Sequence, residues 1–339
     1  MYQQPQSERR RPRGHFHRYS VLLGMALVSI AACAGGESSA SPQLIQNEER
    51  FHEWQVIDVL SGQTVRMDDL MRDLAKQDVV YLGEEHQNRY HTEAALRVLR
   101  SLIEQGRKPT LAMEMFGWDA QSAIDRYVSG QESNRSIFIE QSRWLQNWGG
   151  PFEDYEPLVQ FAKDRQLSLV ALNPPKSLVK MVMKKGLETA KSDPEMAQWS
   201  MRDEPIVDDP LYRERIIHQL EQCHKGGESL YQSMYEASMV RDEGMAKTVV
   251  ERLATIRSAQ DPTAGPLVSY TGGGHIQYQL PVPKRVLRRA GLQVRQRSVY
   301  MTSFERDRVS ELEEMIRDRI ADYVWLTPIG AQGPPRRCR

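Results

Sequence analysis

Cysteines and long apolar runs are scarce in this sequence. The 339 residues contain three cysteines, Cys33, Cys223 and Cys338, and their spacing matches no zinc-finger pattern. An exported protein could bridge Cys223 and Cys338, but nothing in their spacing requires a disulfide. One apolar run, residues 21–30, has about ten residues, whereas a membrane-spanning helix needs about 20. That run therefore predicts no transmembrane helix.

An excess of positive charge is also absent. The 45 basic residues are balanced by 45 acidic ones, and without residues 1–32 the acidic residues predominate slightly. Binding to nucleic acid requires a basic face that neutralises phosphates. We therefore expect no nucleic-acid partner for this chain.

The N-terminus has the pattern of a bacterial lipoprotein signal. Five arginines lie among residues 9–18, a short apolar stretch follows, and small residues directly precede Cys33. This order is typical of a secretion signal, and its end resembles a lipobox, which implies cleavage before Cys33 and a lipid on its sulfur. An ordinary signal peptide with a chance cysteine is the alternative. Ala34 stands where inner-membrane retention signals usually carry aspartate, so we expect an exported, lipid-anchored protein, at the outer membrane where the host has two.

The rest of the chain divides by composition into a tether, one domain and a tail. Residues 33–49 are rich in Gly, Ser, Pro and Gln, which predicts a flexible tether after the signal peptide of residues 1–32. We expect one folded domain over residues 50–329 and a disordered polar tail over residues 330–339.

Short apolar runs alternate with amphipathic stretches, which predicts an α/β fold with a mostly parallel sheet flanked by helices. The expected strands are residues 54–58, 79–82, 110–113, 167–172, 266–270 and a strand that begins at 292, with a turn at 61–64. The expected helices are residues 67–76, 91–105, 120–128, 157–165 and 283–290. Residues 181–256 form a charged helical stretch without strands, which we interpret as a helical insertion or cap at about 175–260.

Polar residues follow three of the predicted strands. The first strand is followed by Glu84 and His86, the second by Glu114, and the fourth by three glycines and His275. Because parallel strands present their carboxyl ends at one edge, we expect these four side chains to converge. Together they could bind a divalent metal, or act without one if a carboxylate raises the basicity of a histidine that activates water. Structural roles are the alternative: a helix cap for Glu84, a buried ion pair for Glu114 and a loop histidine for His275.

Six stretches in collinear order resemble the ChaN-family lipoproteins of the haem-binding uptake and Tiki superfamily. They are residues 79–91 with the Gly-Glu-Glu-His motif, 111–116, 169–173, 241–246, 272–275 and 321–327. The superfamily also contains the TraB and Tiki proteases and the erythromycin esterases. The resemblance implies a shared site made of Glu84, His86, Glu114, the pair Arg241 and Asp242, and His275. The role of Arg241 rests on the resemblance alone, since its helical charge run is typical of a solvated face.

The family resemblance implies haem as the cofactor, with a tyrosine on the iron, and a role in iron uptake. Tyr90, Tyr155 and Tyr231 are the candidates for that tyrosine. The competing hypothesis is a hydrolase that uses the Glu/His site, with or without a divalent metal. The expected partners are a membrane through the lipid anchor, haem or another small ligand, and the haem-uptake machinery.

Overall fold

The computed structural model describes residues 50–334. The predicted signal peptide and tether, with Cys33, lie outside the described residues, as do residues 335–339 of the predicted tail. Within the described range, no helix combines the length and the apolar character needed to cross a membrane.

The core of the protein is one eight-stranded sheet with the strand order β2-β1-β8-β7-β3-β6-β4-β5. Six neighbouring strands are parallel, and β1 and β2 extend the β8 edge as an antiparallel pair. Their bounds are β1 Val56–Asp58, β2 Gln63–Val65, β3 Val79–Glu84, β4 Lys108–Gly117, β5 Leu169–Asn173, β6 Ala264–Gly272, β7 Gln296–Ser303 and β8 Tyr323–Thr327. The prediction of a mostly parallel α/β sheet is confirmed.

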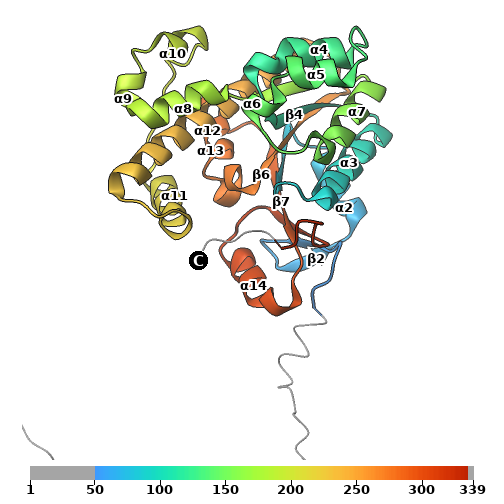
Figure 1. Cartoon of the computed structure of the whole chain (residues 1–339). Helices are drawn as coiled ribbons and strands as arrows, with labels where there is room; N and C mark the ends of the chain where they lie inside the picture. Colours follow the sequence, from blue (N-terminus) through green and yellow to red (C-terminus); the bar gives the residue numbers. More distant parts are fainter. Residues whose placement is uncertain (1–49, 335–339) are drawn as a thin grey trace, which may run out of the picture. The chain divides into compact units, whose positions relative to one another are not determined.

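Helices cover both faces of this sheet, which is why its central strands are continuous apolar runs. All six residues of β3 are buried. One face packs against the helices α2 Met67–Leu74, α3 Arg89–Glu104, α4 Gln121–Val128, α5 Arg135–Gln141, α6 Trp144–Asn147 and α7 Glu156–Asp164. The other face packs against α12 Glu228–Ser258 and α13 Val282–Ala290. Figure 1 shows the sheet between these two groups of helices.

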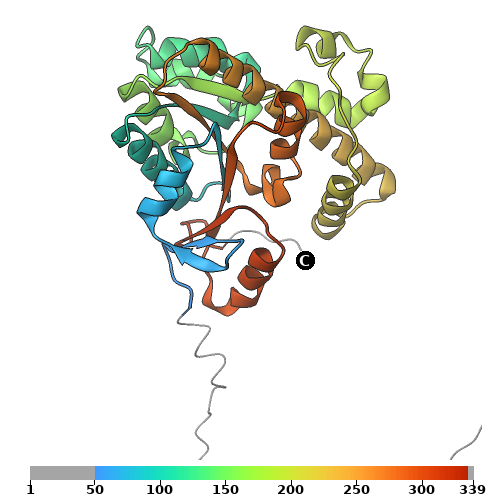
Figure 2. The ribbon, with the colours of Figure 1, turned by 180° about the vertical axis from the view of Figure 1, so that it is seen from behind.

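The segment between β5 and β6 contains helices and no strand, as predicted. It comprises α8 Lys176–Lys185, α9 Leu187–Ala190, α10 Pro194–Gln198, α11 Pro210–Cys223 and α12. These helices share a small core of their own, which includes Leu178, Met196, Tyr212 and Tyr235. Figure 2 shows them gathered at one side of the sheet. The second half of α12 leaves this cluster and packs on the sheet, so a single helix links the insertion to the main core.

Three local predictions differ from the structure. Gln63 and Thr64, expected in a turn, form β2 because they pair with β1. The last predicted strand begins at Gln296 rather than at 292, because Gly291, with φ +89°, ends α13 and a turn follows. The strand β8 and the helix α14 Val309–Arg317 were not expected, and β8 lies inside the sheet between β1 and β7.

Candidate functional site

The polar residues predicted to converge do meet at the carboxyl edge of the sheet. β3 and β6 are neighbours, and Glu84 stands opposite Gly272 in their register. β6 also pairs with β4, which carries Glu114. His275 follows in a short 3-10 helix, Gly273–His275, that begins directly after β6. Three adjacent parallel strands thus deliver all four side chains to one place.

Glu84 is a buried carboxyl group surrounded by donors. Its Oε1 lies 2.8 Å from Nδ1 of His86 and accepts a hydrogen bond from Tyr155 at 2.8 Å, while Oε2 accepts one from Tyr270 at 2.6 Å. Burial raises the pKa of Glu84, and the bonds from the histidine and the two tyrosines oppose that rise only in part. Glu84 does not cap a helix: Asn88 caps α3, through the backbone N–H of Tyr90.

His86 is the half-exposed member of this pair. Its side chain is 46% exposed, and its ring stands edge-on to Trp148 with the ring centroids 4.8 Å apart. Burial of the ring lowers the pKa of His86, but the hydrogen bond with Glu84 and the charge of Glu114 raise it more. Nδ1 of His86 is therefore hydrogen-bonded to Glu84, and Nε2 is the ring nitrogen that can contact a ligand.

Glu114 is a buried carboxylate held by charge. Its Oε1 pairs with the guanidinium of Arg241 and lies 3.4 Å from Nε2 of His275, and its Oε2 accepts a bond from the N–H of Gly272 at 2.6 Å. Burial alone would raise the pKa of Glu114, but the charges of His275 and Arg241 hold it well below its usual range. Glu114 therefore also forms the buried ion pair that the sequence analysis gave as its structural alternative.

His275 lies between two carboxylates. Its Nδ1 is 2.6 Å from Oδ1 of Asp242, whose Oδ2 accepts a hydrogen bond from Tyr212 at 2.5 Å. Burial lowers the pKa of His275, but Glu114 and Asp242 outweigh it and raise the pKa to about 9. At neutral pH His275 is therefore an imidazolium bracketed by Glu114 and Asp242.

The adjacent pair Arg241 and Asp242 reaches the site from the middle of α12. Arg241 bonds to Glu114 and, at 3.3 Å, to Oδ1 of Asn173, whereas Asp242 bonds to His275. Arg241 therefore belongs to the site and not to a solvated face. We call the set of six residues at this site the polar cluster: Glu84, His86, Glu114, Arg241, Asp242 and His275. Gly244, one turn further along α12, is the sequence signal that this part of the helix packs closely against the rest of the protein. A Cβ at Gly244 would lie 2.2 Å from Cγ of Pro174.

Tyr212 and Tyr270 were not singled out from the sequence, and Tyr155 was given a different role. Tyr155, Tyr212 and Tyr270 each donate to a carboxylate of the site and are almost completely buried. Tyr155 had been a candidate iron ligand; its hydroxyl instead bonds to Glu84 and accepts a bond from the N–H of Gln87. No pattern in the local sequence distinguishes these tyrosines from packing residues.

Two glycines serve close packing, Gly272 at the end of β6 and Gly273 directly after it. A Cβ on Gly272 would lie 2.7 Å from Cε1 of His86, and one on Gly273 would lie 2.5 Å from Cε2 of Tyr300. The polypeptide backbone therefore forms part of the wall beside both rings.

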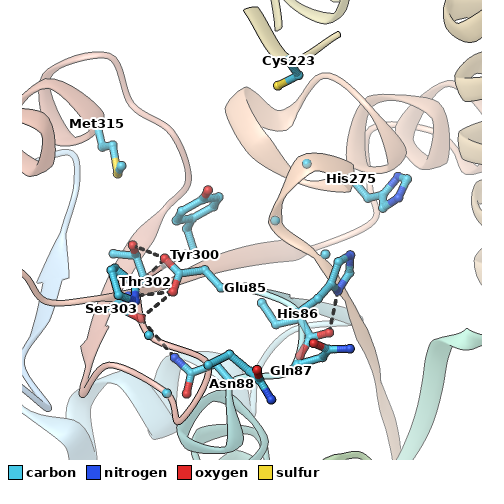
Figure 3. Close-up of a pocket in the computed structure, with 18 of the residues that line it drawn as sticks. Glu85, His86, Gln87, Asn88, Cys223, His275, Tyr300, Thr302, Ser303 and Met315 are labelled. Atoms are coloured by element: carbon cyan, nitrogen blue, oxygen red, sulfur yellow. Dashed lines mark hydrogen bonds and ion pairs between the residues drawn. The ribbon is translucent and has the colours of Figure 1, made fainter. Parts of the chain in front are cut away.

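A cavity of about 900 Å³ opens above the polar cluster, within the range of ligand sites in proteins. Figure 3 shows His86 and His275 on one side of it and Tyr300 and Met315 on the other. Glu85 forms part of the wall, where its carboxylate accepts bonds from the hydroxyls of Thr302 and Ser303, both at 2.6 Å. Residues 219, 222 and 223 of α11 and residues 330 and 332–334 also line the cavity. Cys223 is disulfide-bonded, and the other two cysteines lie outside the described residues.

The donor set does not match the predicted divalent-metal site. Within residues 50–334, no group of three or more His, Cys, Asp or Glu side chains is placed to hold a metal ion. The physical reason is that both glutamates already accept bonds, Glu84 from two phenols and Glu114 from a guanidinium and a backbone N–H.

None of the three tyrosines suggested for iron lines this cavity, whereas Tyr300 does. Tyr90 accepts a bond from Arg89 and packs on Trp54, and Tyr231 donates to the backbone of His224.

Three comparisons with individual proteins describe the similarity. ChaN of Campylobacter jejuni, solved in a study of cofacial haem binding, is 16% identical and covers 80% of this chain and 95% of its own, with a TM-score of 0.61. The chloroplastic protein RETICULATA-RELATED 5 of Arabidopsis thaliana is 24% identical over 263 residues, which are 74% of this chain but only 34% of that protein. This chain therefore spans about a third of that relative's length. An erythromycin esterase mutant is 14% identical, covers 74% of this chain and 76% of its own, and has a TM-score of 0.41.

A family profile matches most of the folded domain. It covers residues 70–286, which contain every residue of the polar cluster, and it describes the haem-binding uptake proteins of the Tiki superfamily. The solved ChaN structure shows that the fold is shared over nearly all of that protein. This chain belongs to the ChaN family of haem-binding uptake proteins.

Proposed function

We propose that this chain is an exported lipoprotein that binds haem in the cavity at the carboxyl edge of the sheet, as part of haem uptake. The observation that carries the proposal is the donor set around that cavity. Tyr300 offers a phenol and His86 an imidazole, two groups that ligate haem iron. Family membership supports haem as the ligand of this cavity.

The cavity residues fit such a ligand in size and chemistry. Gly272 and Gly273 keep side chains off the wall beside Tyr300 and His86, and Met315 contributes an apolar, polarisable surface. Tyr300 would hold ferric iron through its phenolate oxygen. The chain's own part is to shape the pocket and to keep the His86 ring oriented through Glu84.

Titration with hemin tests this proposal. A chain of residues 42–339 contains every described helix and strand and serves as the sample. We expect micromolar or tighter binding with a shifted Soret band, and a loss of the tyrosinate spectrum in Tyr300→Phe but not in the control Tyr90→Phe. A flat titration at tens of micromolar protein would reject haem binding, and an unchanged spectrum in Tyr300→Phe would reject that ligand.

Membrane anchoring is a separate part of the proposal, and the N-terminal pattern supports it. Cys33→Ser should abolish labelling by a lipid analogue and leave the unprocessed precursor, because the modified sulfur is removed. Cys223→Ser is the matched control and should retain labelling. Normal labelling of the Cys33 variant would disprove the lipid anchor.

Hydrolysis is the second candidate, and one observation favours it. His86 presents one nitrogen to the cavity and the other to Glu84, which is the arrangement of an oriented general base. His86 could take a proton from water, Glu84 would stabilise the imidazolium, and the charges of His275 and Arg241 could stabilise an oxyanion. No metal is needed for these steps.

A panel of activated esters tests the hydrolase. Glu84→Gln should lower kcat by about 10²-fold or more, since it removes the partner that orients the base. His275→Ala should also remove activity. Equal turnover by the parent chain and both variants would show that the cluster is not catalytic.

A further inference from the structure

A second cavity lies beside α12, away from the polar cluster. Its volume is about 460 Å³, and it shares no described lining residue with the first cavity. We call it the tryptophan pocket. The lining residues that matter here are Trp118, Gln198, Trp199, Ser200, Lys247 and Arg252. They come from the 3-10 helix Trp118–Ala120 directly after β4, the end of α10 and the loop after it, and the second half of α12.

Two half-buried indole rings form one wall of the tryptophan pocket. The rings of Trp118 and Trp199 lie 6.2 Å apart, centroid to centroid, with 49° between their planes. The N–H of Trp118 donates to Oγ1 of Thr248 at 2.8 Å, and its ring packs where Gly244 has no side chain. Trp118 is therefore held in place by α12. Large rigid aromatic surfaces of this kind bind flat ligands at low cost in conformational entropy.

The helix α12 contributes two cationic side chains and one carboxylate to the lining, Lys247, Arg252 and Glu251. Lys247 is shared between Glu251 and Glu204, the latter at 3.7 Å. The negative charge of Glu251 is thus drawn toward Lys247. Arg252 also lines the pocket, and among residues 50–334 no hydrogen bond, ion pair or ring contact engages its guanidinium. A guanidinium without a protein partner beside an aromatic wall can bind a carboxylate, sulfonate or phosphate group.

We propose that the tryptophan pocket is a second ligand site, which binds a small molecule carrying both a flat aromatic ring and an anionic group. The ring packs against Trp118 and Trp199, and the anion pairs with Arg252. The amide of Gln198 and the hydroxyl of Ser200 lie at the rim, where they can accept or donate hydrogen bonds. The size of the pocket suits a ligand of two or three fused or linked rings.

The probe is 1-anilinonaphthalene-8-sulfonate, which combines two aromatic groups with one sulfonate. Its fluorescence is titrated with the chain of residues 42–339, and the uncharged N-phenyl-1-naphthylamine is titrated in parallel. We expect saturable binding of the sulfonate and at least tenfold weaker binding of the uncharged analogue. Equal affinity for the two probes would overturn the proposed role of the anion.

Variants locate the bound probe. Arg252→Gln should weaken sulfonate binding about tenfold, and Trp199→Leu should weaken both probes. The matched control is Arg257→Gln on the same helix, whose guanidinium faces Asp78 at 3.8 Å and does not line the pocket. Wild-type affinity in both Arg252→Gln and Trp199→Leu would overturn the proposal. So would loss of binding in Tyr300→Phe alone, because that result would place the probe in the first cavity. Circular dichroism of each variant confirms that the fold is intact.

Discussion

The charge on His275 is the most informative quantity to perturb, because it depends on two carboxylates from different parts of the chain. Its pKa is about 9, against an ordinary value of 6.5, in spite of burial that acts in the opposite direction. A shift of that size corresponds to about 3 kcal/mol of preference for the imidazolium. Asp242→Asn removes one of the two charges, while Tyr212 can still donate to the remaining side-chain oxygen.

We expect Asp242→Asn to lower the pKa of His275 by about one unit or more, since an opposite charge in contact contributes about one to three. The stability consequence follows from the raised pKa. In the parent chain, protonated His275 stabilises the folded state. This stabilisation is fully present below pH 6.5 and is lost as the pH rises through about 9. The free energy of unfolding should therefore fall by about 3 kcal/mol over that interval in the parent chain, and by less in Asp242→Asn.

The assay is a two-dimensional NMR titration of the His275 ring, with urea unfolding at pH 6, 7.5 and 9.5 on the same samples. Asp208→Asn is the matched control, because Asp208 accepts a bond from Tyr235 in the way that Asp242 accepts one from Tyr212. It should change stability without moving the pKa of His275. A parent His275 that titrates near 6.5, or one with the same pKa in Asp242→Asn, would refute the reasoning.

Two further substitutions test the packing and the charge balance of the site. Gly272→Ala should destabilise the fold by about 1–3 kcal/mol, because its methyl would lie 2.7 Å from Cε1 of His86. Gly274→Ala should be tolerated, since within residues 50–334 no atom other than those of its own chain neighbours lies within 4 Å of its Cβ position. Comparable urea midpoints for the two alanine variants would contradict this account. Arg241→Leu leaves the buried Glu114 without its guanidinium partner and should lower the free energy of unfolding by about 3 kcal/mol. This value is at the lower end of the range for a broken buried ion pair, because Arg241 is partly exposed. Arg241→Lys should recover part of that loss in the same unfolding assay, and full stability of Arg241→Leu would show that Glu114 does not depend on the pair.

The strands and their polar ends could be predicted from the sequence because both signals are local. Each central strand contains a short apolar run. Glu84 is the last residue of β3, Glu114 lies within β4 directly after such a run, and His275 follows β6. Parallel pairing then brings those ends together without any further information. The short strand β2 and the late strand β8 escaped prediction, since they are stabilised by pairing with distant segments.

The groups that bond to the carboxylates of Glu84 and Glu114 come from residues far away in the chain. Arg241 is 127 positions from Glu114, and Tyr270 is 186 positions from Glu84. A helical charge run gives no indication of which of its members will face the sheet. The same is true of Tyr300, which lines the cavity only because β7 lies beside β3.

The sequence by itself determined the alternation of strands and helices, the family resemblance and the four polar residues at the sheet edge, because periodicity and strand ends are properties of neighbouring residues. Only the tertiary structure decided the charge state of the site. Whether a carboxyl group is ionised depends on its burial and on the groups that surround it in space. Glu84 and Glu114 both follow short apolar runs, yet their pKa values move in opposite directions. Burial raises the pKa of Glu84, and the bonds from its neighbours oppose that rise only in part, whereas the charges of an imidazolium and a guanidinium hold the pKa of Glu114 well below its usual range.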